Sequence, residues 1–250
     1  MIKSSNPALS GNPFALAGAA PSNTMTLQGT INKTATLLAL CIGFAFFSYD
    51  QTINALMQEM APSPIYLLGG SIGAFILALI TIFKKSFAPI TAPLYAILEG
   101  LALGGISAIF EQSYQGLVTQ AILLTFGVLL MMLFLYRTET IRVTETFKKI
   151  VIAGTGAICL IYLLSFILGF FNINLPFIHD SGPFGILFSL VVVVMASLNL
   201  VMDFDFIHQA ALSRRAPKYM EWYGSFSLML TLVWLYLEML RLLSKMQNRK

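Results

Sequence analysis

The chain has 250 residues, of which 57% are hydrophobic and only 10% are charged, with a formal net charge of +4 and a mean hydropathy of +0.80. An ordinary soluble domain carries about 25% charged residues, and a chain of this size cannot bury so many apolar side chains in one water-soluble core. The composition therefore excludes a soluble enzyme, a nucleic-acid-binding protein and a disordered scaffold, and it predicts a membrane protein.

The first part of the chain differs in composition from the rest. Residues 1–32 contain one lysine and no sustained apolar stretch, and they are rich in Asn, Pro, Ser, Ala and Gly. This composition lacks the apolar core of a cleavable signal peptide. We expect residues 1–32 to form a flexible cytoplasmic tail, residues 33–246 a transmembrane domain, and residues 247–250 a short C-terminal tail.

Seven stretches are apolar and approach the roughly 20 residues that a helix needs to cross the hydrocarbon core. They are predicted as helices because an open sheet cannot satisfy its backbone in lipid, and because the alternating segments of a barrel are missing from the sequence. The fold class is therefore an all-α polytopic membrane protein, a bundle of seven transmembrane helices. The predicted spans are Thr34–Tyr49, Pro64–Phe83, Phe87–Phe110, Leu117–Tyr136, Ile150–Phe171, Phe184–Met202 and Trp222–Leu243.

The placement of lysine and arginine predicts the orientation, because short cytoplasmic loops carry an excess of both. Eleven of the 15 basic residues fall in the tail and in the second-to-third, fourth-to-fifth and sixth-to-seventh connections, whereas the opposite connections contain none. We therefore expect the N-terminus in the cytoplasm. Seven spans place the C-terminus outside, although four basic residues lie there: Arg241, Lys245, Arg249 and Lys250. Either the last helix crosses against the charge rule, or it re-enters and the C-terminus stays inside. The basic residues of the internal connections favour seven crossings.

Ionisable side chains inside the spans are candidate functional sites, because an unpaired charge in lipid costs several kcal/mol. Glu99 lies near the middle of the third span. It is either a protonated glutamate bonded to a neighbouring helix, or a proton or cation site facing a cavity. Asp203 and Asp205 close the sixth span, and their i, i+2 spacing directs them to different helix faces. Either both are solvated at the end of the span, or one of them points inward.

Two further acids lie in the seventh span. Glu238 and Arg241 are three residues apart, a spacing that permits an ion pair on one helix face. Glu221 begins the span beside two aromatic residues, which is typical of an interfacial anchor. Its depth also places it to meet Asp203 across the bundle.

Motifs for catalysis or cofactor binding are missing from the sequence. It contains no HExxH, Gly-x-Ser-x-Gly, Walker loop or GxGxxG. The two histidines, His179 and His208, fall in loops on opposite sides of the predicted bundle. The two cysteines, Cys41 and Cys159, stand singly in apolar stretches and offer no CxxC site. We therefore expect no enzyme activity and no cofactor.

Three motifs stand in a characteristic order along the spans. They are Leu98-Glu99-Gly100-Leu101-Ala102-Leu103-Gly104 in the third span, the Asp-Phe-x-x-Ile sequence that closes the sixth, and Leu235-Tyr236-Leu237-Glu238 in the seventh. Taken in order and position, they resemble the Bax inhibitor-1 (TMBIM) superfamily. The tail resembles its bacterial branch through Asn6-Pro7-Ala8-Leu9, and with the compact loops this favours a bacterial inner membrane. The resemblance covers about residues 25–245, which is most of the chain.

The resemblance implies a bundle whose last helix is surrounded by the other six, and it implies a pH-sensitive calcium leak. In the family, an aspartate ending span six and an aspartate in span seven form a proton-sensitive pair. Asp203 matches the first of these and Glu238 the second, while Asp205 is an additional acid. The span-seven acid departs from the family by being Glu. Because Glu238 lies roughly 25 Å beyond Glu221 along the helix, Glu221 is the alternative partner.

Two carboxylates held close together cannot both be charged at low cost, so that pH would change their charge and the association of their helices. Arg214 or Arg215 nearby would favour the charged form, and Arg241 is a further candidate charge partner. Calcium requires several oxygen ligands, so we expect at most weak binding near Asp203 and Asp205, with calcium as the permeating ion.

Three functions are therefore considered. The first is a proton-regulated calcium or cation leak gated by the intramembrane carboxylates. The second is a non-conducting regulator that binds other membrane proteins, such as a quality-control protease, through the tail and the basic loops. The third is a proton-coupled transporter of small solutes that uses Glu99. The expected partners are the lipid bilayer, a permeating cation and a membrane protein, and nucleic acid is not expected.

Overall fold

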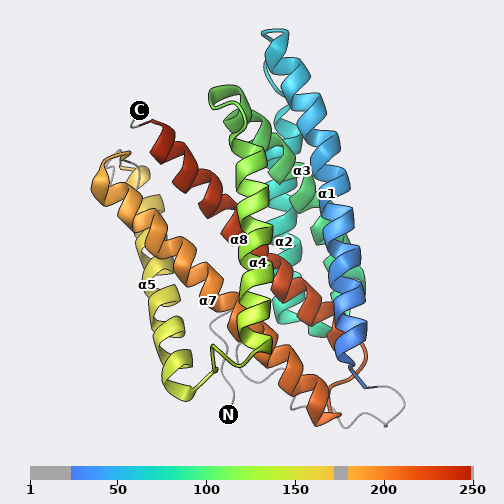
Figure 1. The fold of residues 1–250 in the computed structure, drawn as a ribbon. Coiled ribbons are helices and arrows are strands. Elements are labelled where there is room, and N and C mark those ends of the chain that lie inside the picture. Colours follow the sequence, from blue (N-terminus) through green and yellow to red (C-terminus); the bar gives the residue numbers. More distant parts are fainter. Residues whose placement is uncertain (1–23, 172–179, 249–250) are drawn as a thin grey trace. The chain divides into compact units, whose positions relative to one another are not determined.

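The structure, a computed structural model, describes residues 24–171 and 180–248 (Figure 1). Within these residues, β geometry is limited to one isolated bridge between Thr24 and Pro217, and most of the chain is helical. Seven helices are long and apolar enough to cross a membrane. The predicted all-α fold with seven spans is therefore confirmed. Most of the predicted N-terminal tail and the last two residues lie outside the described residues.

The spans follow the predicted order and differ from the prediction at their ends. α1 begins at Leu27, before the predicted domain boundary at Lys33, and α7 extends to Ser213, beyond the predicted end at Met202. The elements are α1 (Leu27–Met57), a π-helical turn η3 (Ile65–Gly69) that continues into α2 (Gly70–Phe83), a 3₁₀ turn η4 (Lys85–Phe87) that continues into α3 (Ala88–Ser113), α4 (Leu117–Arg137), α5 (Glu145–Gly169), α7 (Pro183–Ser213) and α8 (Met220–Gln247).

Local capping explains several of these ends. The Thr26 side chain accepts a hydrogen bond from the backbone amide of Gly29, which satisfies a free donor in the first turn of α1. Thr144 caps α5 in the same way, by accepting from the backbone amide of Phe147. α7 ends where Arg214 adopts a φ of 50°, outside the right-handed helical region.

The described residues form two compact units. The α1–α3 unit contains residues 24–118 and 207–229, and the α4–α5 unit contains residues 119–171, 180–206 and 230–248. α7 and α8 are continuous helices, and each of them has one part in the α1–α3 unit and the other part in the α4–α5 unit. Of the seven candidate spans, α8 has the largest buried share, at 61% of its most apolar window.

In the α1–α3 unit, α1 and α3 approach closely because glycines of α3 face the backbone of α1. A Cβ atom at Gly100 would overlap the carbonyl oxygen of Cys41, and a Cβ atom at Gly104 would overlap that of Ala45. Backbone atoms cannot move aside as the end of a flexible side chain can. The Gly100/Gly104 pair therefore allows this crossing, as small residues do in membrane helices.

Large apolar side chains are exposed along the spans. A monomeric soluble protein rarely exposes large contiguous apolar patches, whereas side chains that face lipid are apolar. The exposure therefore supports a multi-pass membrane protein. Examples that are more than half exposed, one from each of six helices, are Phe46, Phe75, Ile90, Leu123, Leu160 and Phe184.

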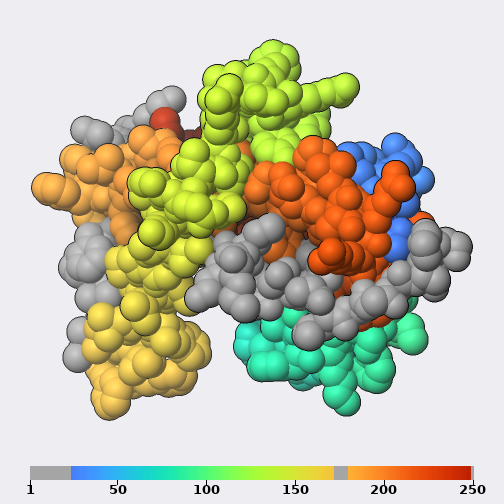
Figure 2. Space-filling model, turned by 90° about the horizontal axis from the view of Figure 1, so that it is seen from below, coloured from blue at the N-terminus to red at the C-terminus, as the bar shows by residue number. Residues whose placement is uncertain are grey.

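Basic residues from three separate segments lie at one end of the α1–α3 unit. Lys33 and Lys218 pair with the same carboxylate on α8, and Lys85 lies over the Tyr223 ring, 5.6 Å from its centroid. Figure 2 looks onto this end, with the α2–α3 connection in teal and the end of α7 in orange. These segments therefore share one side of the unit, and their location in the cytoplasm stays a prediction.

Candidate functional site

Asp203 is fully buried within α7, and its carboxylate contacts α8. The Thr231 hydroxyl donates to Asp203 Oδ2 over 2.6 Å. α7 continues for ten residues beyond Asp203, because Phe206 and Ile207 prolong its buried apolar face. The prediction that Asp203 closes the sixth span is therefore wrong, and the aspartate lies inside the helix.

Asp205 faces a different neighbour. The Tyr136 hydroxyl of α4 donates to Asp205 Oδ1 over 3.3 Å, and the Tyr136 ring lies 6.2 Å from the ring of Phe204. Two residues advance a helix by about 200°, so side chains at this spacing diverge. The carboxylates of Asp203 and Asp205 therefore bind separate hydroxyl donors on separate helices.

Glu238 of α8 is 2% exposed and accepts two hydrogen bonds on a single oxygen. Arg241 Nη1 donates to Glu238 Oε1 over 2.5 Å, and the Tyr162 hydroxyl of α5 donates to it over 2.9 Å. Arg241 also donates to the Tyr162 hydroxyl over 2.8 Å. Glu238 Oε2 is buried and has no hydrogen-bond partner in the described part of the chain. The predicted ion pair between Glu238 and Arg241 is confirmed.

Asp203 contacts α8 at a different level from the one at which Glu238 stands on that helix. Thr231, which binds Asp203, precedes Glu238 by seven residues, or about 10 Å along the helix axis. Each carboxylate has its own hydroxyl donor. The proton-sensitive pair that the resemblance implies for these two acids stays a prediction.

A second cation lies one turn beyond Arg241. Lys245 is 4% exposed, and its Nζ donates to the Gly185 carbonyl over 3.0 Å and to the Ser189 hydroxyl over 2.8 Å, both on α7. Positions 231, 238 and 245 are seven residues apart and therefore share one helix face. We call this face, with Arg241 beside it, the α8 polar stripe: Thr231, Glu238, Arg241 and Lys245.

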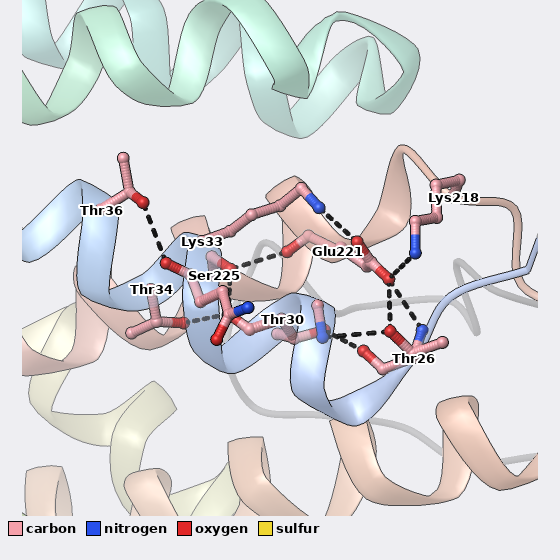
Figure 3. A network of polar contacts seen from close by, with 10 residues as sticks. Thr26, Thr30, Lys33, Thr34, Thr36, Lys218, Glu221 and Ser225 are labelled. Atoms are coloured by element: carbon pink, nitrogen blue, oxygen red, sulfur yellow. Dashed lines mark hydrogen bonds and ion pairs between the residues drawn. The ribbon is translucent and has the colours of Figure 1, made fainter.

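In the α1–α3 unit, Glu221 joins the first turn of α8 to the beginning of α1 (Figure 3). Its Oε1 accepts from the Thr26 backbone amide over 2.9 Å and from the Thr26 hydroxyl over 2.8 Å. Lys218 lies 2.8 Å from the same oxygen, and Lys33 pairs with Oε2. The carboxylate is fully buried, and its negative charge is balanced by two lysines whose side chains are partly exposed.

The surrounding backbone is fitted closely to Glu221. A Cβ atom at Gly29 would overlap the Glu221 carboxylate. The Ser225 hydroxyl donates to the Thr30 carbonyl over 2.9 Å, which fastens the next turn of α8 to the next turn of α1. These contacts anchor α1 to α8. The interfacial role and the contact with Asp203 that the sequence suggests for Glu221 stay predictions.

The charge partners of the buried acids differ in part from those predicted. Arg214 and Arg215 are exposed, and neither forms an ion pair among residues 24–171 and 180–248. Glu221 instead pairs with two lysines, of which Lys218 has the local i, i+3 spacing of a helical ion pair. Lys33 lies 188 residues away from Glu221 in the chain, and no local spacing indicates such a contact.

Glu99 is half-buried in α3. Tyr95, one turn earlier, forms a side-chain hydrogen bond with it. Tyr95 is itself buried and packs edge-to-face on Phe226 of α8, with the ring centroids 5.0 Å apart. Glu99 therefore has a polar partner within its own helix, and its use as a proton or cation site stays a prediction.

The described residues contain no group of three or more His, Cys, Asp or Glu side chains that could hold a metal ion. Calcium near Asp203 or Asp205 would therefore need hydroxyl, backbone or water oxygens in addition to one carboxylate. Weak calcium binding at this place, and the expected lack of a cofactor, stay predictions. His179 lies outside the described residues, and His208, which was expected in a loop, lies within α7 because that helix continues to Ser213.

Comparison with protein families gives one match across nearly the whole chain. Residues 6–248 match the model of a family described as Bax inhibitor 1 like. No curated protein and no solved structure matches the chain. The family match spans all seven helices and every candidate residue described above. It does not assign a role to any of these residues, so their roles are argued from their contacts.

Proposed function

Because this chain belongs to the Bax inhibitor 1-like family, we propose that it is a pH-regulated cation leak with calcium as the permeating ion. In this proposal the N-terminus is cytoplasmic and the membrane is a bacterial inner membrane, in keeping with the distribution of basic residues. The observation that carries the proposal is Asp203, a fully buried carboxylate inside a membrane span. Ionisable groups at such depth are costly and usually functional.

Asp203 has the surroundings that a proton-sensitive contact needs. When ionised, the carboxylate only accepts hydrogen bonds, and Thr231 supplies a donor. When protonated, it loses its charge and gains an O–H donor, and that new donor needs an acceptor at the same level. A change of pH would therefore alter the contact between α7 and α8 within the α4–α5 unit, and a local change of this kind can bias a two-state element.

Calcium flux into proteoliposomes, measured from about pH 8 to about pH 5, tests the proposal. Asp203→Asn removes the titratable group at nearly constant size, and Asp50→Asn changes an exposed aspartate of α1 as the matched control. We expect pH-dependent flux in the native chain and in the control, and a changed pH dependence in Asp203→Asn. Equal flux in the native chain and Asp203→Asn at every pH would remove Asp203 from the gate.

A non-conducting regulator of other membrane proteins, such as a quality-control protease, is the second candidate. Arg214 and Arg215 are exposed where α7 ends and would present a basic surface to an acidic partner. Crosslinking from these two positions to a membrane protein, together with a lack of flux in correctly inserted native protein, would favour this candidate.

Proton-coupled transport of a small solute through Glu99 is the third candidate. Glu99→Gln should then abolish proton uptake while the protein stays folded, because the amide keeps the size of the carboxyl and cannot carry a proton. Unchanged proton uptake in the variant would remove this candidate.

A further inference from the structure

The α8 polar stripe changes the sign of its charge along the helix. Near its beginning it binds the Asp203 carboxylate through Thr231, and its next polar residue is Glu238. Toward the C-terminal end of α8 it carries two cations, Arg241 and Lys245. In the orientation proposed above, an ion arriving from outside would meet these cations before it meets a carboxylate.

Arg241 is the outermost partner of Glu238. The Arg241 side chain is 40% exposed and the Glu238 side chain 2%, so the guanidinium is the member of the pair that solvent can reach. Tyr162 of α5 fixes its position, since its hydroxyl accepts from Arg241 and its ring centroid lies 5.1 Å from the guanidinium carbon. Phe188 of α7 in turn packs edge-to-face on the Tyr162 ring.

One of the two carboxylate oxygens of Glu238 accepts no hydrogen bond in the described part of the chain. Both donors bind Oε1, while Oε2 is buried and has no hydrogen-bond partner in the described part of the chain. A buried acceptor without a partner is costly, and natural structures rarely leave one without a reason. The guanidinium thus balances the charge of Glu238 and leaves free an oxygen that could coordinate a cation.

We propose that the Arg241 guanidinium is a tethered cation, which occupies the Glu238 carboxylate and thereby closes the α8 polar stripe to cations from solution. Glu238 then becomes a cation-binding site when the guanidinium moves away. A buried carboxylate that has lost its partner is strongly destabilised, so it draws in another cation. This inference rests on the proposed leak function and adds a blocking residue to it.

Flux of calcium in vesicles of phosphatidylethanolamine and phosphatidylglycerol tests the block. We expect Arg241→Ala to raise the flux about tenfold above that of the native chain, which corresponds to about 1.4 kcal/mol in the barrier. The double variant Glu238→Gln/Arg241→Ala should return the flux to the native level or below, because the Glu238 carboxylate is no longer there to attract the ion. A merely structural pair would make the single and double variants alike, and that result would overturn the proposal.

Arg142→Ala is the matched control. Arg142 also pairs with a glutamate three residues earlier, Glu139, but both side chains are more than 75% exposed. Removing this arginine should leave the flux unchanged. A rise in flux as large as that of Arg241→Ala would show a nonspecific effect of lost positive charge and would refute the block.

Chemical rescue gives an independent readout. Methylguanidinium at millimolar concentration should lower the flux of Arg241→Ala by refilling the vacated position, with no effect on the native chain or Arg142→Ala. If Arg241→Ala folds only with the added ion, it is purified with methylguanidinium and the flux is followed as the ion is diluted. If methylguanidinium does not change the calcium flux of Arg241→Ala, that result would contradict the proposal.

The flux measurements distinguish a failure of the Arg241 block from a failure of the proposed leak function. If the native chain conducts calcium and Arg241→Ala conducts it equally well, the tethered block is wrong and the leak function stands. If neither the native chain nor any variant conducts, although all are correctly inserted, the leak function fails and the block fails with it.

Discussion

Glu221 accepts hydrogen bonds from both the backbone amide and the hydroxyl of Thr26, which lies 195 residues earlier in the chain. Lys33 and Lys218 pair with the same carboxylate. One buried charged group therefore joins the beginning of α1 to the beginning of α8. Because a buried charge must keep its partners, the stability of the α1–α3 unit should depend on Glu221.

Glu221→Gln should lower the free energy of unfolding by about 2–3 kcal/mol, because both lysines lose their counter-charge. The cost is below that of a fully buried pair because the Lys218 side chain is 49% exposed. Unfolding in detergent measures the change. Glu145→Gln is the control, since Glu145 is exposed and also pairs with a lysine, Lys148, and it should leave stability unchanged. Equal losses in the two variants would contradict the anchoring role.

Gly29→Ala should lower the free energy of unfolding by about 2 kcal/mol, because its Cβ atom would overlap the Glu221 carboxylate and push it from its donors. Gly43→Ala in the same helix is the control, since a Cβ atom there meets nothing within 4 Å. Thermal unfolding of the two variants compares them directly. Stability equal to that of the native chain in Gly29→Ala would show that the beginning of α1 adapts freely.

Thr231→Val should lower the free energy of unfolding by about 1–3 kcal/mol, because valine has the shape of threonine and no hydrogen to donate to Asp203. Thr231→Ser restores the donor and should recover most of the loss. Chemical denaturation of all three proteins in the same detergent measures the difference. Equal free energies of unfolding for Thr231→Val and Thr231→Ser would show that this hydrogen bond does not contribute to stability.

Gly104→Ala should destabilise the crossing of α1 and α3 by about 1–3 kcal/mol, because its Cβ atom would overlap backbone atoms of Ala45. The control is Gly127→Ala in α4, where the added methyl group meets nothing within 4 Å. The fraction of each variant that survives heating in detergent measures the effect. Survival of Gly104→Ala at the level of Gly127→Ala would argue against a close crossing.

The number and order of the spans could be predicted because each requires a stretch of apolar residues that is plain in the sequence. The end of α7 could not be predicted in the same way. Asp203 and Asp205 have the composition of a membrane boundary, but α7 continues past them with a buried apolar face at Phe206 and Ile207. The hydrogen bond that Asp203 accepts inside the protein comes from Thr231, on another helix. A partner supplied by a different helix leaves no trace in the local pattern.

The site shows the same division between local and distant contacts. The pair of Glu238 and Arg241 could be predicted because the two residues are one helical turn apart. Tyr162, which binds both, lies 76 residues from Glu238 and has no such signal. Two local signals indicate further contacts. Thr231, Glu238 and Lys245 recur every seven residues and thus mark one face of α8, and Lys218 lies three residues before Glu221.

The separation of Thr26 from Glu221 also fixes an order of events during synthesis. A ribosome adds about 5–20 residues per second, so the 195 residues between them take about 10–40 s to make. Throughout that interval the beginning of α1 is already complete, and Lys33 has not yet received its carboxylate. The last helix to be synthesised is therefore the one that secures the first. A nascent chain released before Met220 would expose an unanchored α1 terminus to cellular proteases.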